Sequence, residues 1–307
     1  GMHGSYFANM AVHHSDLVIC IGARFDDRST GGVFDKFAPN AKVIHIDIDP
    51  STLNKNIKVH CPIVGDAKSV ITQLDESIPL EFKPDSKTRK DWFNQIKEWE
   101  LHHPTVASQN GKHIKTSFAI DTISKITKGK AVVVTDVGQH QMIACRYAEF
   151  SQSKSNITSG GLGTMGFALP AALGAKMGAP ERDVVAVIGD GGFQMNIQEL
   201  GTIFQTQAAV KIVILNNDFL GMVRQWQQLF FDKRYASTEM VNPDFIKIAE
   251  GYFIDAKRVT DREQMTAAVA EMMKSDKPYL LEVCVEKENN VFPMIPSGAS
   301  VSDIRLE

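Results

Sequence analysis

The sequence is poor in cysteine, in long apolar runs and in unbalanced charge, and each shortage excludes a class of protein. No apolar run approaches the roughly 20 residues that span a membrane. A formal net charge of −3 gives no bias toward nucleic acid. The four cysteines lie far apart without a Cys-x-x-Cys pair, which predicts reduced, buried thiols. They are Cys20, Cys61, Cys145 and Cys284. We therefore expect a cytoplasmic protein with neither a membrane nor a nucleic-acid partner.

Length and composition set the scale of the fold. With 307 residues, 43% of them hydrophobic and 22% charged, the chain resembles a soluble globular protein with room for about two domains. The opening "GMHGSYFANMAVHHSD" lacks the basic start and the apolar core of a signal peptide. A helical pattern is already under way at Tyr6, so we expect the chain to be a piece of a longer polypeptide.

Strand-like and helical patterns divide the chain unevenly. In the first part, two strand-like runs (16–24 and 41–50) precede a short strand and a helix that starts near Asp66. An amphipathic helix then carries Trp92, Ile96 and Trp99 on one face. We expect an incomplete α/β domain at 1–80, a linker with a helix at 81–112, a second domain at 113–286, and a tail or lid at 287–307.

The second domain alternates regularly between strands and helices, which predicts a doubly wound parallel sheet with helices on both faces. The expected strands are 130–138, 184–188, 210–217 and 278–285. The expected helices are 117–127, 166–178, 193–207 and 261–274.

Two of these strands end on polar residues that suit a metal ion. "VVAVIGDGG" brings a buried strand straight to Asp190, and Asn217 ends the next strand 27 residues later. A strand–helix–strand unit places both residues at one edge of the sheet, where open α/β sheets bind ligands. A carboxylate and an amide oxygen are ligands that Mg²⁺ accepts. A lone Asp-Gly is more often a helix cap, and Asn216-Asn217 alone is equally well a turn.

A dinucleotide fingerprint in the same domain is a weaker signal. Gly161-x-Gly163-x-x-Gly166 matches G-x-G-x-x-G, but that site requires a buried strand immediately before the glycines. Only "SNITS" precedes them, and the later acid, Asp190, is better explained together with Asn217. We therefore do not expect a nicotinamide cofactor here.

The paired motif resembles that of thiamine-diphosphate enzymes, and the whole chain is similar to the C-terminal part of the acetolactate synthase (acetohydroxyacid synthase) catalytic subunit family. Four further stretches carry the resemblance: "GARFDDR" (22–28), "DVGQHQM" (136–142), "GGLGTMGFALPAALGAK" (160–176) and "GMVRQWQ" (221–227). The resemblance implies a doubly wound thiamine-diphosphate-binding domain, preceded by part of a Rossmann-like, flavin-binding central domain.

The resemblance also implies site residues. Mg²⁺ is held by Asp190, Asn217 and the backbone oxygen of Phe219, and Met165 supports the bent cofactor. The thiamine diphosphate contacts are Val137, Gly138, Gln139, His140, Gly163, Met165, Gly191, Gly192 and Met195. Glycines that open a helix present free N–H groups to phosphate. On the residues alone, the alternative for His140 is an ordinary loop histidine, and a methionine such as Met165 is more often core filling.

By the same resemblance, FAD lies along residues of the first domain, and a few side chains contact substrate. The FAD contacts are Gly22, Ala23, Arg24, Asp47, Ile48, Gly65, Asp66 and Ala67. Arg28 receives the carboxylate of the second 2-oxo acid, as suits a guanidinium. Met222 and Trp226 line the substrate channel, although residues four apart on a helix usually pack in a core. Without this context, "RFDDR" is more often a solvated loop with internal salt bridges.

The implied reaction joins pyruvate to a second 2-oxo acid with loss of CO₂. Pyruvate as acceptor gives 2-acetolactate, and 2-oxobutyrate gives 2-aceto-2-hydroxybutyrate, both precursors of branched-chain amino acids. We expect a homodimer or homotetramer, with a small regulatory subunit as a possible partner. Pyruvate oxidase, a 2-oxo acid decarboxylase, and a non-catalytic cofactor-binding subunit are the alternatives.

One part of the family pattern has no counterpart in this sequence. The family activates its cofactor with a glutamate from an N-terminal domain of the neighbouring subunit, and no segment here resembles that domain. The glycine-rich first part of the flavin domain is absent as well. We therefore expect the chain to be inactive when isolated.

Overall fold

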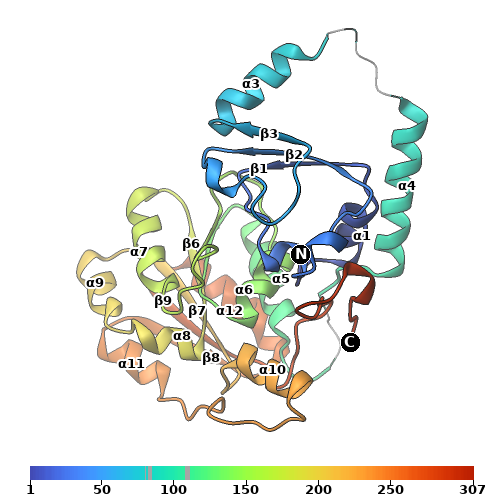
Figure 1. The fold of residues 1–307 in the computed structure, drawn as a ribbon. Helices are drawn as coiled ribbons and strands as arrows, with labels where there is room; N and C mark the ends of the chain where they lie inside the picture. The colour runs from blue at the N-terminus through green and yellow to red at the C-terminus, as the bar shows by residue number, and fades with distance from the viewer. Residues whose placement is uncertain (80, 82–84, 108–110) are drawn as a thin grey trace. The chain divides into compact units, whose positions relative to one another are not determined.

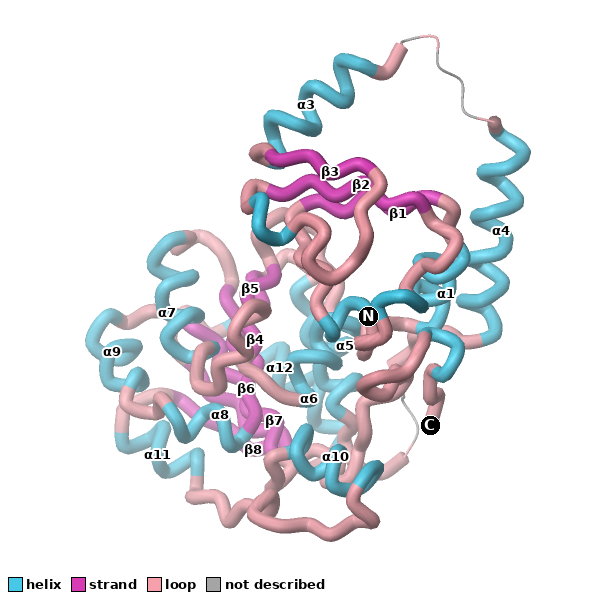
Figure 2. The backbone as a smooth tube through the Cα atoms, in the orientation of Figure 1, coloured by secondary structure: helices cyan, strands magenta, loops and turns pink. Residues whose placement is uncertain are grey.

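A computed structural model describes residues 1–79, 81, 85–107 and 111–307, and these form two compact units (Figures 1 and 2). Unit 1 comprises Gly1–Thr105 together with Phe292–Glu307, and unit 2 comprises Val106–Val291. Within the described residues, no helix is long and apolar enough to cross a membrane.

Unit 1 is built on a three-stranded parallel sheet in the order β1-β2-β3 (Figure 2). The strands are β1 (Leu17–Ile21), β2 (Lys42–Asp47) and β3 (Cys61–Val64). The helices are α1 (Tyr6–His14), α2 (Asp27–Thr30), α3 (Ala67–Ser77) and α4 (Ser86–His102), with short 3₁₀ turns η1 (Phe34–Lys36), η2 (Pro50–Thr52) and η3 (Val301–Asp303). Helix α3 starts as predicted, because the Asp66 carboxylate accepts from the Ser69 N–H and caps it.

The first strand is less buried than its sequence predicts. β1 pairs only with β2, and its side chains Leu17, Ile19 and Ile21 are 46%, 54% and 41% exposed. Cys61 on β3 is exposed too, which contradicts the expectation of four buried thiols. All four cysteines are free, but only Cys20 is buried; Cys145 is also exposed. A parallel sheet normally has both faces covered, and the described residues of unit 1 leave part of this one uncovered.

The expected linker helix and most of the expected tail, from Phe292 onward, belong to unit 1. In α4 the half-buried Trp99 stacks on His14 of α1 at 5.4 Å between ring centroids. The tail returns to the start of the chain, where the Ile295 N–H donates to the Met2 carbonyl over 2.8 Å. A small apolar core of Met10, Ile295 and Val301, with Trp99 packed against it, joins α1, α4 and the tail. The three side chains predicted to share a face of this helix are all half-buried, and Trp99 packs against the core of unit 1.

Unit 2 contains a six-stranded parallel sheet in the order β5-β4-β6-β7-β9-β8. Its strands are β4 (Val132–Thr135), β5 (Asn156–Thr158), β6 (Val184–Gly189), β7 (Val210–Asn216), β8 (Asp255–Val259) and β9 (Tyr279–Cys284). Its helices are α5 (Thr116–Thr127), α6 (Gln139–Tyr147), α7 (Ala168–Gly178), α8 (Asp190–Met195), α9 (Glu199–Thr206), α10 (Gly221–Phe230), α11 (Phe245–Gly251) and α12 (Arg262–Lys274).

Helices cover both faces of this sheet, as the alternation predicted (Figure 1). One apolar core joins the sheet to α5, α6 and α12, and the other joins it to α7, α8, α9 and α11. The four predicted strands are the central ones, β4, β6, β7 and β9, whose side chains are almost all buried. The two edge strands were not predicted, because β5 has three residues and β8 reads "DAKRV".

The direction of strand succession changes at β4. From β4 the chain goes to β5 on one side and then to β6 and β7 on the other. The carboxyl ends of β4 and β6 are therefore adjacent at a topological switch point, which is where open α/β sheets bind ligands. Connecting segments at this edge carry the predicted cofactor residues.

Candidate functional site

A cavity of about 270 Å³ opens at this edge of the sheet in unit 2. It is formed by the ends of β4, β6 and β7 and the first turn of α10. Its lining residues are Thr116, Val137, Gly138, Gln139, His140, Met142, Gly163, Met165, Gly189, Asp190, Gly191, Gly192, Leu215, Asn217, Phe219, Leu220, Gly221, Met222, Val223 and Val285. The fold thus gathers most of the residues predicted to hold magnesium and thiamine diphosphate.

Asp190 is the electrostatic centre of the cavity. Its side chain follows β6 directly and the residue is only 2% exposed. Burial raises the pKa of its carboxyl to about 6, while hydrogen bonds from the Asn242 amide and the Gly191 N–H act in the opposite direction. Asp190 forms no ion pair with any residue that the structure describes. A buried carboxylate without a cation is a costly arrangement, which bound metal would relieve.

Asn217 and Phe219 lie in the turn that follows β7, next to Asp190. Parallel pairing sets Gly189 of β6 against Leu215 of β7, so both strands end at the same level. The Asn217 Oδ1 accepts the Phe219 N–H over 3.2 Å, and Asp218 between them has φ +54°. One carboxylate, one amide oxygen and a backbone carbonyl make an oxygen set suited to Mg²⁺. No group of three or more His, Cys, Asp and Glu side chains with metal-binding geometry occurs among the described residues.

His140 sits in the wall of the cavity at the start of α6. The imidazole is 8% exposed and packs against Gly138 and Gly189, where a Cβ would come within 3.0 Å of the ring. Burial lowers its pKa to about 4, outweighing the opposing effect of Asp136. The ring is therefore neutral at pH 7, and its buried Nε2 has no hydrogen-bond partner among the residues that the structure describes. A bound group with a polar atom here would satisfy it.

Gln139 is occupied by the protein itself. Its Nε2 donates to Gln225 Oε1 over 2.8 Å and to the Asn289 carbonyl over 2.9 Å. Gln225 is fully buried in α10, and its Oε1 also accepts the Val291 N–H. This amide pair joins the start of α6 to α10, so Gln139 holds the cavity wall together. Gln225 was not among the predicted residues, since nothing in its local sequence distinguishes it.

A second residue missed by the sequence analysis is Asp136, which is fully buried at the end of β4. Its carboxylate accepts three main-chain N–H groups, from Val137 at 2.8 Å and from Gly166 and Ala168 at 3.0 Å each. These bonds fix the glycine-rich segment before α7 to the end of β4. An acid that ends an apolar strand was the available signal.

The glycine-rich segment that resembles a dinucleotide fingerprint follows a short strand and borders the cavity. The strand before Gly161, β5, is a three-residue edge strand whose residues are exposed or half-buried, so no buried strand leads into these glycines. Gly163 lines the same cavity as Asp190 and Asn217. The Gly191 N–H is engaged by the Asp190 side chain over 3.1 Å, although it was expected to be free for phosphate.

The predicted methionine and tryptophan residues of unit 2 divide into two pairs. Met165 and Met222 line the cavity. Met195 and Trp226 are not among its lining residues: Met195 is 51% exposed, and Trp226 packs on Phe230 with 4.8 Å between ring centroids. α8 ends at Met195 and α9 starts at Glu199, so the single helix predicted over 193–207 is interrupted.

The residues predicted to contact FAD gather at the carboxyl edge of the sheet in unit 1. Gly22 follows β1, Asp47 ends β2 and Gly65 follows β3, with Gly65 N–H donating to the Asp47 carbonyl over 3.0 Å. Asp66 is the cap of α3, and Arg24 pairs with Asp26 at 3.2 Å. The others there are Ala23, Ile48 and Ala67. Arg28 lies in α2, is exposed, and donates to Met2 Sδ over 3.4 Å.

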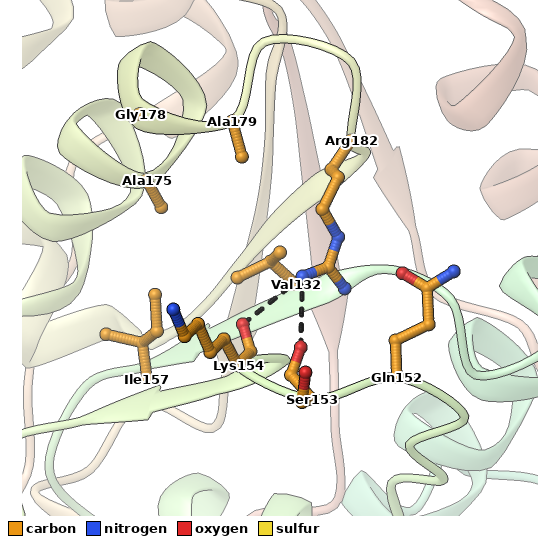
Figure 3. Close-up of a pocket in the computed structure, with 9 residues that line it drawn as sticks. All are labelled: Val132, Gln152, Ser153, Lys154, Ile157, Ala175, Gly178, Ala179 and Arg182. Atoms are coloured by element: carbon orange, nitrogen blue, oxygen red, sulfur yellow. Dashed lines mark hydrogen bonds between the residues drawn. The ribbon is translucent and has the colours of Figure 1, made fainter.

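A second cavity in unit 2, of about 740 Å³, lies at the opposite, amino-terminal end of β4 (Figure 3). Figure 3 shows Arg182 reaching across it to the segment of Ser153 and Lys154. Its guanidinium donates to the carbonyls of Ser153, Lys154 and Lys130 and to Ser155 Oγ. Because these groups are backbone and hydroxyl oxygens, Arg182 attaches a loop to the sheet. The side chains that line this cavity form no set of candidate metal ligands comparable to that of the first cavity.

Two family models match the chain. The thiamine pyrophosphate enzyme C-terminal TPP-binding domain matches residues 136–283, and the thiamine pyrophosphate enzyme central domain matches residues 1–74. The first contains every lining residue of the cavity except Thr116 and Val285. The second covers the sheet of unit 1 and most of α3.

Curated relatives give the same assignment over nearly the whole chain. Acetolactate synthase isozyme 2 large subunit of Escherichia coli is 44% identical over 99% of this chain and 54% of its own length. The large subunit of Corynebacterium glutamicum acetolactate synthase is 43% identical over 99% and 50%, respectively. Acetolactate synthase 1, chloroplastic, of Oryza sativa is 40% identical over 100% and 49%. The chain spans about half the length of these relatives. It therefore belongs to the thiamine pyrophosphate enzymes, as a homologue of acetolactate synthase large subunits.

Proposed function

We propose that the protein to which this chain belongs condenses pyruvate with a second 2-oxo acid, in a reaction that depends on thiamine diphosphate and Mg²⁺ and releases CO₂. The observation that carries the proposal is the cavity at the switch point of unit 2. There a buried carboxylate with no ion-pair partner in the described part of the chain lies beside an amide and a backbone carbonyl. The names of the relatives, acetolactate synthase, support the reaction class.

The lining residues fit the diphosphate end of the cofactor together with a metal ion. Asp190, Asn217 and the Phe219 carbonyl would hold Mg²⁺. The Nε2 of His140, which has no partner among the described residues, would donate to a phosphate oxygen once the ring takes up a proton. Gly191 and Gly192 leave this wall free of side chains, and Met165 adds an apolar surface. When bound, the cofactor supplies the electron sink for decarboxylation. The protein supplies binding, orientation and exclusion of water.

The substrate side of the proposal rests on fewer contacts. Met222 lies in the cavity wall at the first turn of α10, where it would shape the space for the acceptor acid. We propose Trp226 and Arg28 as further substrate residues, with Arg28 binding the acceptor's carboxylate. Pyruvate and 2-oxobutyrate are the proposed acceptors, giving 2-acetolactate and 2-aceto-2-hydroxybutyrate.

FAD, assembly and regulation complete the proposal. The strand ends of unit 1 at Gly22, Asp47 and Gly65 form an edge suited to a flavin nucleotide. The relatives are named large subunits, so we propose a small regulatory subunit as partner, and a homo-oligomer of the large one. No glutamate lies among the described residues that line the cavity, so we expect turnover to require a glutamate from elsewhere.

Calorimetric titration of the chain with thiamine diphosphate, with and without Mg²⁺, tests the proposal directly. We expect binding that depends on Mg²⁺ in the unchanged chain and is lost in Asp190→Ala. Asp121→Ala, which changes a half-buried carboxylate on α5 that does not line the cavity, is the matched control and should bind normally. Equal binding with and without Mg²⁺, or binding unaffected by Asp190→Ala, would exclude the assigned metal site.

A further inference from the structure

Asn242 lies outside every motif recognised in the sequence, yet its amide contacts the centre of the site. Its Nδ2 lies 2.8 Å from Asp190 Oδ2, 3.0 Å from Asn216 Oδ1 and 3.2 Å from Asp218 Oδ1. One amide nitrogen therefore lies within hydrogen-bond distance of two carboxylates and of the side-chain oxygen of Asn216. It comes from the loop between α10 and α11, so the chain folds back to reach it.

The orientation of this amide is set from both sides. Gln194 Nε2 donates to Asn242 Oδ1 over 3.0 Å, which leaves only the nitrogen to face Asp190. Asn216 Nδ2 donates to Glu282 Oε1 over 2.8 Å, and so turns its own oxygen toward Asn242. Arg258 in turn fixes Glu282, with 2.7 Å between Nε and Oε2. The donors and acceptors agree along the whole network.

A neutral donor is the appropriate group for this position. A lysine or arginine in place of Asn242 would neutralise Asp190 and compete with a metal ion. A carboxylate would repel both Asp190 and Asp218. An amide N–H fixes one oxygen of the Asp190 carboxylate and leaves the full negative charge available to a cation.

We propose that Asn242 is a positioning residue for the metal site: it orients the Asp190 carboxylate so that the site favours Mg²⁺. This rests on the proposed function, because it takes Asp190 to be a metal ligand. Mg²⁺ requires near-ideal octahedral geometry, whereas Ca²⁺ tolerates irregular and variable coordination. Loss of Asn242 should therefore weaken Mg²⁺ binding more than Ca²⁺ binding. A general weakening of the fold would affect both ions alike.

The experiment titrates Mg²⁺, and separately Ca²⁺, into the chain saturated with thiamine diphosphate, using calorimetry. Asn242→Ala should lose 10–100-fold in Mg²⁺ affinity, the range typical when a group that orients a metal ligand is removed. Its loss of Ca²⁺ affinity should be clearly smaller. Gln194→Ala, which frees the Asn242 amide to rotate, should lower the Mg²⁺ affinity and, less, the Ca²⁺ affinity, each by a smaller factor than Asn242→Ala does. Val241→Ala is the matched control, because Val241 is adjacent and 100% exposed.

The outcomes separate the inference from the proposed function. Metal binding by the unchanged chain with a normal Mg²⁺ affinity in Asn242→Ala overturns the inference alone. Equal losses for Mg²⁺ and Ca²⁺ in Asn242→Ala also overturn it, since they indicate a role in folding only. Failure of the unchanged chain to bind either metal overturns the assigned metal site and the inference with it.

Discussion

Replacing Asp136 by asparagine should destabilise unit 2 strongly, even though only one atom type changes. The carboxylate accepts three main-chain hydrogen bonds in a fully buried position. A hydrogen bond to a charged group contributes about 1.5–3 kcal/mol. An asparagine oxygen could keep the two bonds at Oδ1, but its NH₂ would then face the Ala168 N–H.

The expected loss follows from that count. One charge-assisted bond disappears and the other two lose their charge, while the cost of burying an ion is relieved. We expect the free energy of unfolding to fall by about 2–4 kcal/mol. Gly192→Ala should also destabilise the unit, because its Cβ would lie 2.6 Å from Asp136 Oδ1.

Urea unfolding followed by far-ultraviolet circular dichroism measures the difference. Asp121→Asn is the control: Asp121 pairs with Lys125 at 2.6 Å on the surface of α5, and its loss should cost about 0.3–0.5 kcal/mol. A loss for Asp136→Asn no larger than that of the control would refute the assignment of Asp136 as the structural anchor of the segment before α7.

Three further predictions concern the cavity. The pKa of Asp190 is raised from 3.8 to about 6, so the stabilising contribution of its protonated form is complete below pH 4 and is lost as pH rises through 6. Without metal at pH 7.5, the free energy of unfolding of Asp190→Asn, measured by urea titration, should therefore be about 3 kcal/mol higher than that of the unchanged chain. Mg²⁺ with thiamine diphosphate should stabilise only the unchanged chain. The pKa of His140, about 4 in the free chain, should rise when diphosphate binds, because a nearby anion favours the imidazolium; nuclear magnetic resonance of the ring measures this, and an unchanged value would place the anion elsewhere. Gly138→Ala should lose about 1–3 kcal/mol and weaken cofactor binding, since Gly138 has φ +153° and its Cβ would lie 2.9 Å from the His140 ring; unchanged melting and affinity would contradict this.

The sequence predicted the fold best where burial is complete on both faces. β6 and β7 are continuous apolar runs, which is the pattern of a central parallel strand. The same pattern misled at β1, where apolar residues are exposed because the described part of unit 1 does not cover them. β8 was missed because its edge position allows charged residues. Each error thus arises because the burial of a strand depends on the elements that pack beside it, and the sequence of the strand does not specify those elements.

The site was predictable to the extent that a motif stands at a strand end. Asp190 and Asn217 follow neighbouring parallel strands, so their proximity follows from topology alone. Asn242 and Gln225 come from a loop and a helix that approach the cavity only through tertiary packing. Asparagine and glutamine are common in turns and on helix surfaces, and local sequence does not separate those uses from a buried network. Such residues become recognisable only from their hydrogen-bond partners.

The chemistry of these missed residues explains how the cavity would select its ligand. At neutral pH, Asp190 is the one side chain with substantial negative charge among the described residues that line it, and His140 is uncharged. The groups that position the wall, Gln139, Gln225 and Asn242, are neutral amides. A diphosphate alone would therefore meet a carboxylate and no compensating cation, whereas a diphosphate carrying Mg²⁺ would bring the charge that Asp190 lacks. Positive side chains in that wall would bind phosphate without metal, so we expect the neutral amides to make diphosphate binding depend on the metal.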